Sequence, residues 1–161
     1  MPLTLDAPPS AEIPAGTPTL TVASDLLGAI ELPVAALYTF AAGLYAFDRC
    51  RRFALVPAGR EGLFWLQSVE ERGLVFLLAD PFHWFPDYVA DVPEAELAAL
   101  GRAGDAPIGV LAIVTLPGAP GEEASVNLRA PVILDPEGRS GRQVVLRDDR
   151  LGVREPLALA A

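Results

Sequence analysis

Short apolar runs alternate with turn-forming glycine and proline over most of the chain. Thr19–Ser24 alternates apolar and polar side chains, a pattern that predicts a half-buried strand. Residues 74–79 (LVFLLA) are apolar at every position, which predicts a strand covered on both faces. The turn before this run, residues 70–73, predicts an antiparallel hairpin with Leu63–Ser68. Further strands are predicted at residues 29–33, 36–40, 52–57, 87–91, 108–115, 125–130, 132–134 and 143–146.

Helical signals are few. Residues 93–100 begin with proline and early acidic residues and stop at Gly101, which predicts a helix. Residues 45–51 contain no β-branched side chain and are predicted to form one helical turn. Many short strands with regular turn signals favour a barrel or sandwich. The predicted fold is therefore mainly β, a compact antiparallel β-barrel-like domain with one or two short helices.

The 161 residues suit a single domain, which is predicted to span residues 19–157. Residues 1–18 are rich in proline and alanine with few large side chains, so they are predicted to form a disordered tail. The apolar stretch 26–47 has the length of a membrane span, but Glu31, Pro33 and Gly43 interrupt it. Short buried strands explain it better. No secretory signal is recognisable, and the single cysteine, Cys50, rules out an internal disulfide, so a soluble cytoplasmic protein is predicted.

The net charge of −9 narrows the choice of partners. Anionic lipid surfaces and nucleic-acid phosphates repel such a protein, so neither a membrane nor direct nucleic-acid binding is expected. A basic protein partner is favoured instead. Arg49, Arg51 and Arg52 form the only dense basic spot, which leaves an OB-like RNA-binding barrel, with Trp65 or Trp84 stacking bases, as a weaker alternative.

Catalytic motifs of hydrolases, zinc proteases, P-loop and dinucleotide-binding proteins are absent. The nearest approach to a metal site is Asp80, His83 and Asp87, which would support a metal-dependent hydrolase as an alternative. His83 is the only histidine, and a zinc or iron site normally needs a second histidine or a cysteine. The arginines beside Cys50 favour a reactive thiol, but no base is nearby in sequence. Neither a cofactor, a metal nor an enzyme activity is predicted.

Five blocks of sequence, in order, resemble the flagellar assembly factor (FliW) family. Residues 64–70 (FWLQSVE) are similar to the family's FWLQSVED signature, and residues 126–132 (VNLRAPV) to its VNLxAPI segment. Residues 141–146 (GRQVVL) resemble the family's GxQxIL stretch. The other two blocks are residues 80–88, with Asp80-Pro81-Phe82 and Pro86-Asp87-Tyr88, and residues 40–53, which correspond to FPxGIxGF and the following strand.

The chain departs from the family pattern at three positions where proline, glycine and tyrosine are usual: Ala41, Ala46 and Leu151.

The resemblance implies a β-barrel-like protein that switches between two partners. FliW proteins bind flagellin in the cytoplasm, and after flagellin is exported they bind CsrA, an RNA-binding translational repressor. Binding antagonises CsrA away from its RNA site and so regulates flagellin synthesis, a chaperone-like role in flagellum biogenesis. CsrA is basic, which agrees with the acidic charge of this chain.

The predicted partner-binding residues fall in three places: the polar end of the signature hairpin, the aromatic segment that follows it, and the VNLRAPV block. Five ring-bearing side chains within residues 82–88 suggest either an exposed apolar patch or a cap on the barrel. The two amides in the set have an alternative role as buried groups that satisfy backbone atoms. The predicted residues are Gln67, Glu70, Glu71, Phe82, Trp84, Phe85, Asp87 and Asn127.

Overall fold

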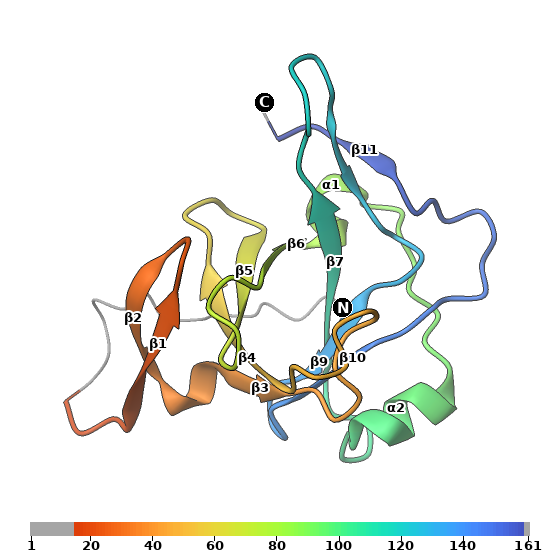
Figure 1. The fold of residues 1–161 in the computed structure, drawn as a ribbon. Coiled ribbons are helices and arrows are strands. Elements are labelled where there is room, and N and C mark those ends of the chain that lie inside the picture. The colour runs from red at the N-terminus through yellow and green to blue at the C-terminus, as the bar shows by residue number, and fades with distance from the viewer. Residues whose placement is uncertain (1–14, 160–161) are drawn as a thin grey trace.

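A seven-stranded barrel is the centre of the molecule (Figure 1). The computed structural model describes residues 15–159. The barrel follows the order β7-β6-β5-β4-β3-β10-β9 and closes where β9 pairs with β7. All pairs are antiparallel except β3 with β10. Its elements are β3 (Leu37–Thr39), β4 (Arg52–Pro57), β5 (Leu63–Ser68), β6 (Val75–Ala79), β7 (Gly109–Thr115), β9 (Val132–Asp135) and β10 (Ser140–Gln143).

A separate two-stranded sheet and a two-strand extension of the barrel sheet lie outside the barrel. A hairpin of β1 (Thr19–Ser24) and β2 (Gly28–Pro33) lies on one flank, followed by a 3-10 helix, η2 (Val34–Ala36). On the opposite side β8 (Ala124–Val126) pairs with β7, and β11 (Glu155–Leu157) pairs with β8. The long connection between β6 and β7 contains α1 (Pro81–Trp84) and α2 (Glu94–Leu100) (Figure 1). No helix in the described part of the chain is long and apolar enough to span a membrane.

Alternation along the strands divides the apolar side chains between three clusters. In β4, Phe53 and Leu55 face the barrel interior, whereas Ala54 and Val56 pack beneath the β1–β2 hairpin. In β6, Leu78 faces the interior, and the neighbours of Leu78 on either side pack on an outer cluster. The β6–β7 connection, β8 and β11 cover that outer cluster. The predicted coverage of residues 74–79 on both faces is therefore confirmed.

The interior is closed by one tight contact. Phe40 is fully buried and meets Phe53 edge-on, with ring centroids 5.2 Å apart. A Cβ on Gly141 of β10 would lie 2.3 Å from the Phe40 ring. The ring therefore fills the space that any other side chain at position 141 would need. This contact anchors the start of the β3–β4 loop to β10.

Most predicted elements are confirmed, with three ranges predicted to the residue: β1, β4 and β5. The mainly-β barrel with short helices and the helix ending at Gly101 are also as predicted. Of the predicted tail, residues 1–14 lie outside the described part. The carbonyl of Pro18 accepts a hydrogen bond from the backbone N–H of Val34, 3.0 Å away. Within the apolar stretch 26–47 lie β2 and β3, as expected for short strands.

Four local predictions were wrong. Residues 45–51 form successive turns because Ala46 adopts φ 68°, which ends any right-handed helix. Residues 87–91 are irregular, since this segment packs through Tyr88 and forms no strand pairs. The strand predicted at 125–130 ends at Val126, where an Asn127-centred turn begins. The last barrel strand is Ser140–Gln143, earlier than the predicted 143–146, because residues 136–139 suffice for the turn.

Candidate functional site

The β5–β6 turn is organised by the last two residues of the signature strand. Gln67 and Ser68 are both fully buried. The Gln67 amide donates to the backbone carbonyls of Ser68, Glu71 and Arg72 at 3.0, 3.3 and 3.2 Å. The Ser68 hydroxyl accepts from the Glu71 backbone N–H at 3.0 Å. The Gln67 amide and the Ser68 hydroxyl thus hold the turn through its backbone groups.

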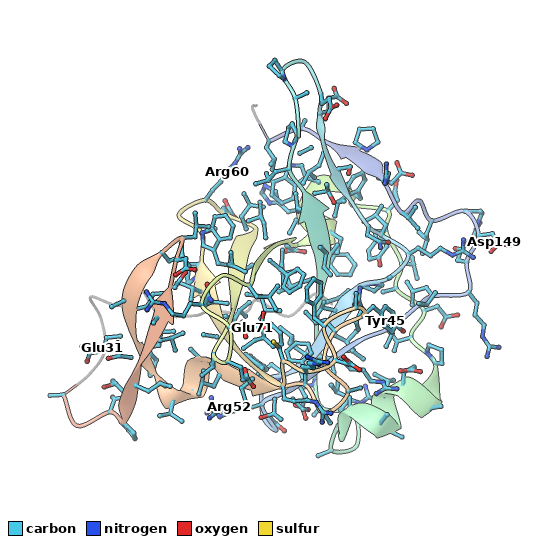
Figure 2. The ribbon with its side chains drawn as sticks, viewed as in Figure 1. Glu31, Tyr45, Arg52, Arg60, Glu71 and Asp149 are labelled. Atoms are coloured by element: carbon cyan, nitrogen blue, oxygen red, sulfur yellow. The ribbon has the colours of Figure 1, made fainter. Side chains whose placement is uncertain are left out.

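Glu70 and Glu71 both lie exposed on this turn, but they differ in their bonding. One Glu70 carboxylate oxygen accepts the backbone N–H groups of Arg51 and Arg52 at 3.1 and 2.9 Å. Glu70 therefore joins the turn to the start of β4. The side chain of Glu71 makes no hydrogen bond or ion pair within residues 15–159, so its charge is available to solvent (Figure 2).

The β1–β2 turn is tied to the same place. The backbone N–H of Asp25 donates to the carbonyl of Arg72 at 3.0 Å, and the two side chains form an ion pair at 3.3 Å. Both side chains are largely exposed, so the ion pair itself contributes little stability. The backbone bond fixes the relative position of the two hairpins. Sequence patterns gave no signal for this link, because it joins residues 47 positions apart through main-chain atoms.

The aromatic segment forms α1 and the irregular chain after it. Asp80 caps the helix by accepting from the Phe82 backbone N–H at 3.0 Å, and Pro81 occupies the first turn. Phe82, Trp84 and Phe85 are partly buried against the outer core, and His83 is exposed. Phe82 and Tyr88 pack with ring centroids 5.6 Å apart. These rings act mainly as a cap on the core, one of the two roles the sequence left open.

Tyr88 connects this segment to the VNLRAPV block. Its hydroxyl donates to the carbonyl of Leu128 at 2.7 Å, and burial raises the pKa of Tyr88 to about 12. Asn127, half-buried, accepts the backbone N–H groups of Arg129 and Ala130 at 3.1 and 3.0 Å through its side-chain oxygen. Asn127 therefore shapes a turn by bonding to backbone groups. It accepts from backbone N–H groups, whereas the Gln67 amide donates to backbone carbonyls.

The structure separates the predicted residues into two groups. Gln67, Glu70 and Glu71 lie at the end of the β5–β6 hairpin where the turn is, and the aromatic segment begins at the opposite end of β6. The five residues of β6 span about 15 Å at the usual strand rise. Asn127 belongs to the second group through the Tyr88–Leu128 bond. Partner contact by any of the eight residues stays a prediction.

The alternative sites do not assemble. Among residues 15–159 no group of three or more His, Cys, Asp or Glu side chains is placed to hold a metal ion. Asp80 is engaged in capping α1. Cys50 is 3% exposed and lies in the barrel interior, where a solvent-borne substrate does not reach it. Trp65 and Trp84 pack on the outer core, which leaves neither ring free on both faces for base stacking.

Comparisons with known proteins give the family. The sequence model described as "FliW protein" matches residues 21–157, most of the chain. The chain belongs to the FliW family. A flagellar assembly factor FliW of Symbiobacterium thermophilum is 42% identical over 123 residues, covering 75% of this chain and 88% of the relative. Another, of Syntrophotalea carbinolica, is 40% identical over 132 residues, covering 81% and 92%.

The fold agrees with that of the family. A crystal structure of the flagellar assembly factor FliW superposes with a TM-score of 0.77 at 26% identity, covering 85% of this chain and 96% of the other. The signature blocks of the FliW family have structural roles in this chain. FWLQS builds the β5–β6 turn, VNLRA builds the Asn127 turn, and the glycine of GxQ accommodates Phe40.

Proposed function

We propose that this FliW-family chain is a non-catalytic cytoplasmic regulator that binds flagellin and CsrA in turn. Bound to CsrA, it antagonises translational repression, and flagellin competes for it. Family membership over residues 21–157 is the observation that carries the proposal. The net charge of −9 supports a basic partner on independent grounds.

The charge is concentrated on one part of the surface. The β6–β7 connection, residues 80–108, contains six acidic residues and a single arginine, Arg102, a net charge of −5. Asp87, Asp91 and Glu94 in this connection are exposed. We assign this acidic connection as the contact for CsrA, together with Glu71 at the hairpin turn. Gln67 and Asn127 would act indirectly by holding their turns.

A displacement experiment tests the function. Purified CsrA and flagellin from the source organism are each mixed with the chain and separated by size-exclusion chromatography with light scattering. We expect a complex with each protein, and release of CsrA as flagellin is added. CsrA affinity should fall as salt rises, since surface charges beyond about a Debye length are screened. The proposal is refuted if the chain forms no complex with CsrA and none with flagellin.

Charge neutralisation tests the surface. The combined change Asp87→Asn, Asp91→Asn and Glu94→Gln should weaken CsrA binding by about tenfold, mainly by slowing association. The combined change Glu31→Gln, Glu123→Gln and Glu137→Gln is the matched control, because it removes the same charge from three exposed acids outside the acidic connection. Equal effects of the triple change and the control would show that only net charge matters. No effect of the triple change would place CsrA elsewhere.

A further inference from the structure

We propose that the β3–β4 loop, residues 40–51, forms a second binding surface, which takes a polypeptide segment carrying apolar side chains next to carboxylates. The surface goes beyond the proposed function, because it is built from a different segment than the acidic connection and has the opposite charge. Three observations carry it: exposed aromatic side chains, the rigid geometry that displays them, and arginines that have no acidic partner.

The loop turns two aromatic rings outward. Tyr45 is 56% exposed and Phe47 38% exposed, whereas Phe40, Leu44 and Cys50 of the same loop are buried in the barrel. Val145, 52% exposed, follows Gln143 by two residues. The Tyr45 backbone N–H donates to the Gln143 side chain at 3.1 Å, and positions 143 and 145 share one side of an extended segment. The five other exposed large apolar side chains of residues 15–159 are spread over separate turns: Leu26, Val34, Val89, Leu116 and Val153.

Main-chain bonds hold the loop in a fixed shape. The carbonyls of Phe40, Leu44 and Phe47 each accept a backbone N–H three residues ahead, at 2.8 to 3.2 Å. A Cβ on Gly43 would lie 2.6 Å from Cα of Asp48, so the chain crosses itself closely there. Ala46, between the two exposed rings, holds φ at 68°, a strained conformation for alanine. A surface that is already rigid loses less entropy on binding.

Arginines border the rings without acidic partners. Arg49 and Arg52 are exposed, and neither guanidinium makes an ion pair or hydrogen bond within the described residues. The Arg51 guanidinium is held by the carbonyls of Asp48 and Ala41 at 3.0 and 2.7 Å. Acidic residues outnumber basic ones in the chain by 21 to 12, yet this end of the loop carries two free guanidinium groups three positions apart. They complement carboxylates on a partner.

A polypeptide fits this surface better than RNA. The Phe47 ring packs against Phe76, with centroids 5.3 Å apart, and is 38% exposed, so only part of it is available for base stacking. The net charge of −9 opposes a polyphosphate, but a short segment with one or two carboxylates meets only the local arginines.

Peptide selection on the full chain tests the proposal without assuming a partner. Random twelve-residue peptides displayed on phage are selected on the immobilised chain, and enriched sequences are remade with a fluorophore for anisotropy. We expect leucine or aromatic residues next to aspartate or glutamate. Tyr45→Ala should weaken binding about tenfold, as for a central aromatic anchor, and Arg49→Gln or Arg52→Gln about threefold each. Leu116→Ala and Arg154→Gln are matched controls and should leave binding unchanged.

Several outcomes would overturn the proposal. These are no enrichment over an unrelated immobilised protein, enriched peptides that are basic, and peptides that bind Tyr45→Ala as well as the wild type. Competition by a 20-nucleotide single-stranded RNA at low salt would indicate a nucleic-acid surface instead. If Tyr45→Ala does not fold, Arg49→Gln gives the test instead, because the Arg49 side chain is exposed and makes no bond within the described residues. Failure here leaves the displacement of CsrA by flagellin unaffected, so the two proposals fail separately.

Discussion

Two connections of the barrel contain aromatic rings, which are packed on the core in one connection and exposed in the other. In the β6–β7 connection, residues 80–108, Phe82, Trp84 and Phe85 pack on the outer core, and four of the six acidic residues are exposed. In the β3–β4 loop, residues 40–51, the rings of Tyr45 and Phe47 are exposed, and arginines follow them in the sequence. The first connection carries a net charge of −5, and the second carries +1.

The difference follows from what each connection must cover. The β6–β7 connection crosses the outer face of the barrel, so its rings replace solvent over the apolar backs of β6 and β7. The β3–β4 loop only closes one end, and Phe40 with Leu44 already fills that end. Of its remaining rings, Phe47 packs one side on Phe76, and Tyr45 stays mostly exposed. Aromatic content alone therefore does not indicate a binding surface. Whether the rings of a loop are exposed depends on how much apolar core surface lies beneath the loop for them to cover.

The largest expected effect is at the contact beneath the β3–β4 loop. Gly141→Ala places a methyl group 2.3 Å from the Phe40 ring in a filled core, so overpacking should cost about 3 kcal/mol in the free energy of unfolding. Urea denaturation measures it. Gly118→Ala is the control, because its Cβ meets nothing closer than 3.7 Å and its φ is ordinary, and it should change stability by less than about 0.5 kcal/mol. Equal stability of the two variants would mean that Phe40 does not fill the interior.

A pH effect comes next and belongs to the β6–β7 connection. Burial raises the pKa of Tyr88 to about 12, and burial also raises the pKa of Tyr38. Between pH 10 and 12 the unfolded chain loses the Tyr88 proton while the folded chain keeps it, so the stabilisation present below pH 10 is lost as pH rises. The loss attributable to Tyr88 is at most about 2.7 kcal/mol over this range.

The Tyr88→Phe variant separates the contribution of Tyr88 to the pH dependence of stability from that of Tyr38. The variant should be about 1 kcal/mol less stable at neutral pH, because the Leu128 carbonyl loses its donor. Its stability should then decline less steeply above pH 10 than that of the wild type, with Tyr38 supplying the remainder. Identical slopes for both proteins in denaturant titrations at pH 9, 10 and 11 would contradict burial of the Tyr88 hydroxyl.

Truncating one ring in each connection compares them directly. Phe82→Ala should destabilise the fold by about 2 kcal/mol, because the ring is partly buried and packs on Tyr88. Tyr45→Ala should change stability by less than about 0.5 kcal/mol, because the ring is mostly exposed. Thermal melts of the two variants measure the difference. A larger loss for Tyr45→Ala would reverse the roles assigned to the two connections.

Sequence patterns predicted the barrel well because strand burial follows local rules. Alternation in Thr19–Ser24 and the continuous apolar run before Asp80 each specify which faces are covered, and β1, β4 and β5 were predicted to the residue. The candidate site was harder. The aromatic content of residues 82–88 is visible in the sequence, but the tertiary contact that buries Phe82 is not. The Gln67 amide shows the same limit, because its three acceptors are backbone carbonyls.

The Tyr45 loop could not be predicted because its geometry depends on one backbone angle. Residues 45–51 have the composition of a helical turn, and the φ of Ala46 excludes it. The only signal was the family pattern, in which glycine is usual at this position. Glycine adopts positive φ without a steric penalty, so the departure at Ala46 marks a strained residue.

Ala46→Gly should give the smallest effect, and a stabilising one. The substitution removes about 1 to 2 kcal/mol of left-handed strain and costs about 0.5 to 1 kcal/mol in unfolded-state entropy, which leaves a gain of about 0.5 kcal/mol. Ala42→Gly is the matched control in the same loop, because Ala42 does not have positive φ, and it should lose stability. If denaturant titrations show that Ala46→Gly gains stability and Ala42→Gly loses it, position 46 fixes the loop that displays Tyr45. A loss of stability in both variants would mean that the loop relaxes around Ala46, and the rings would then not be rigidly displayed.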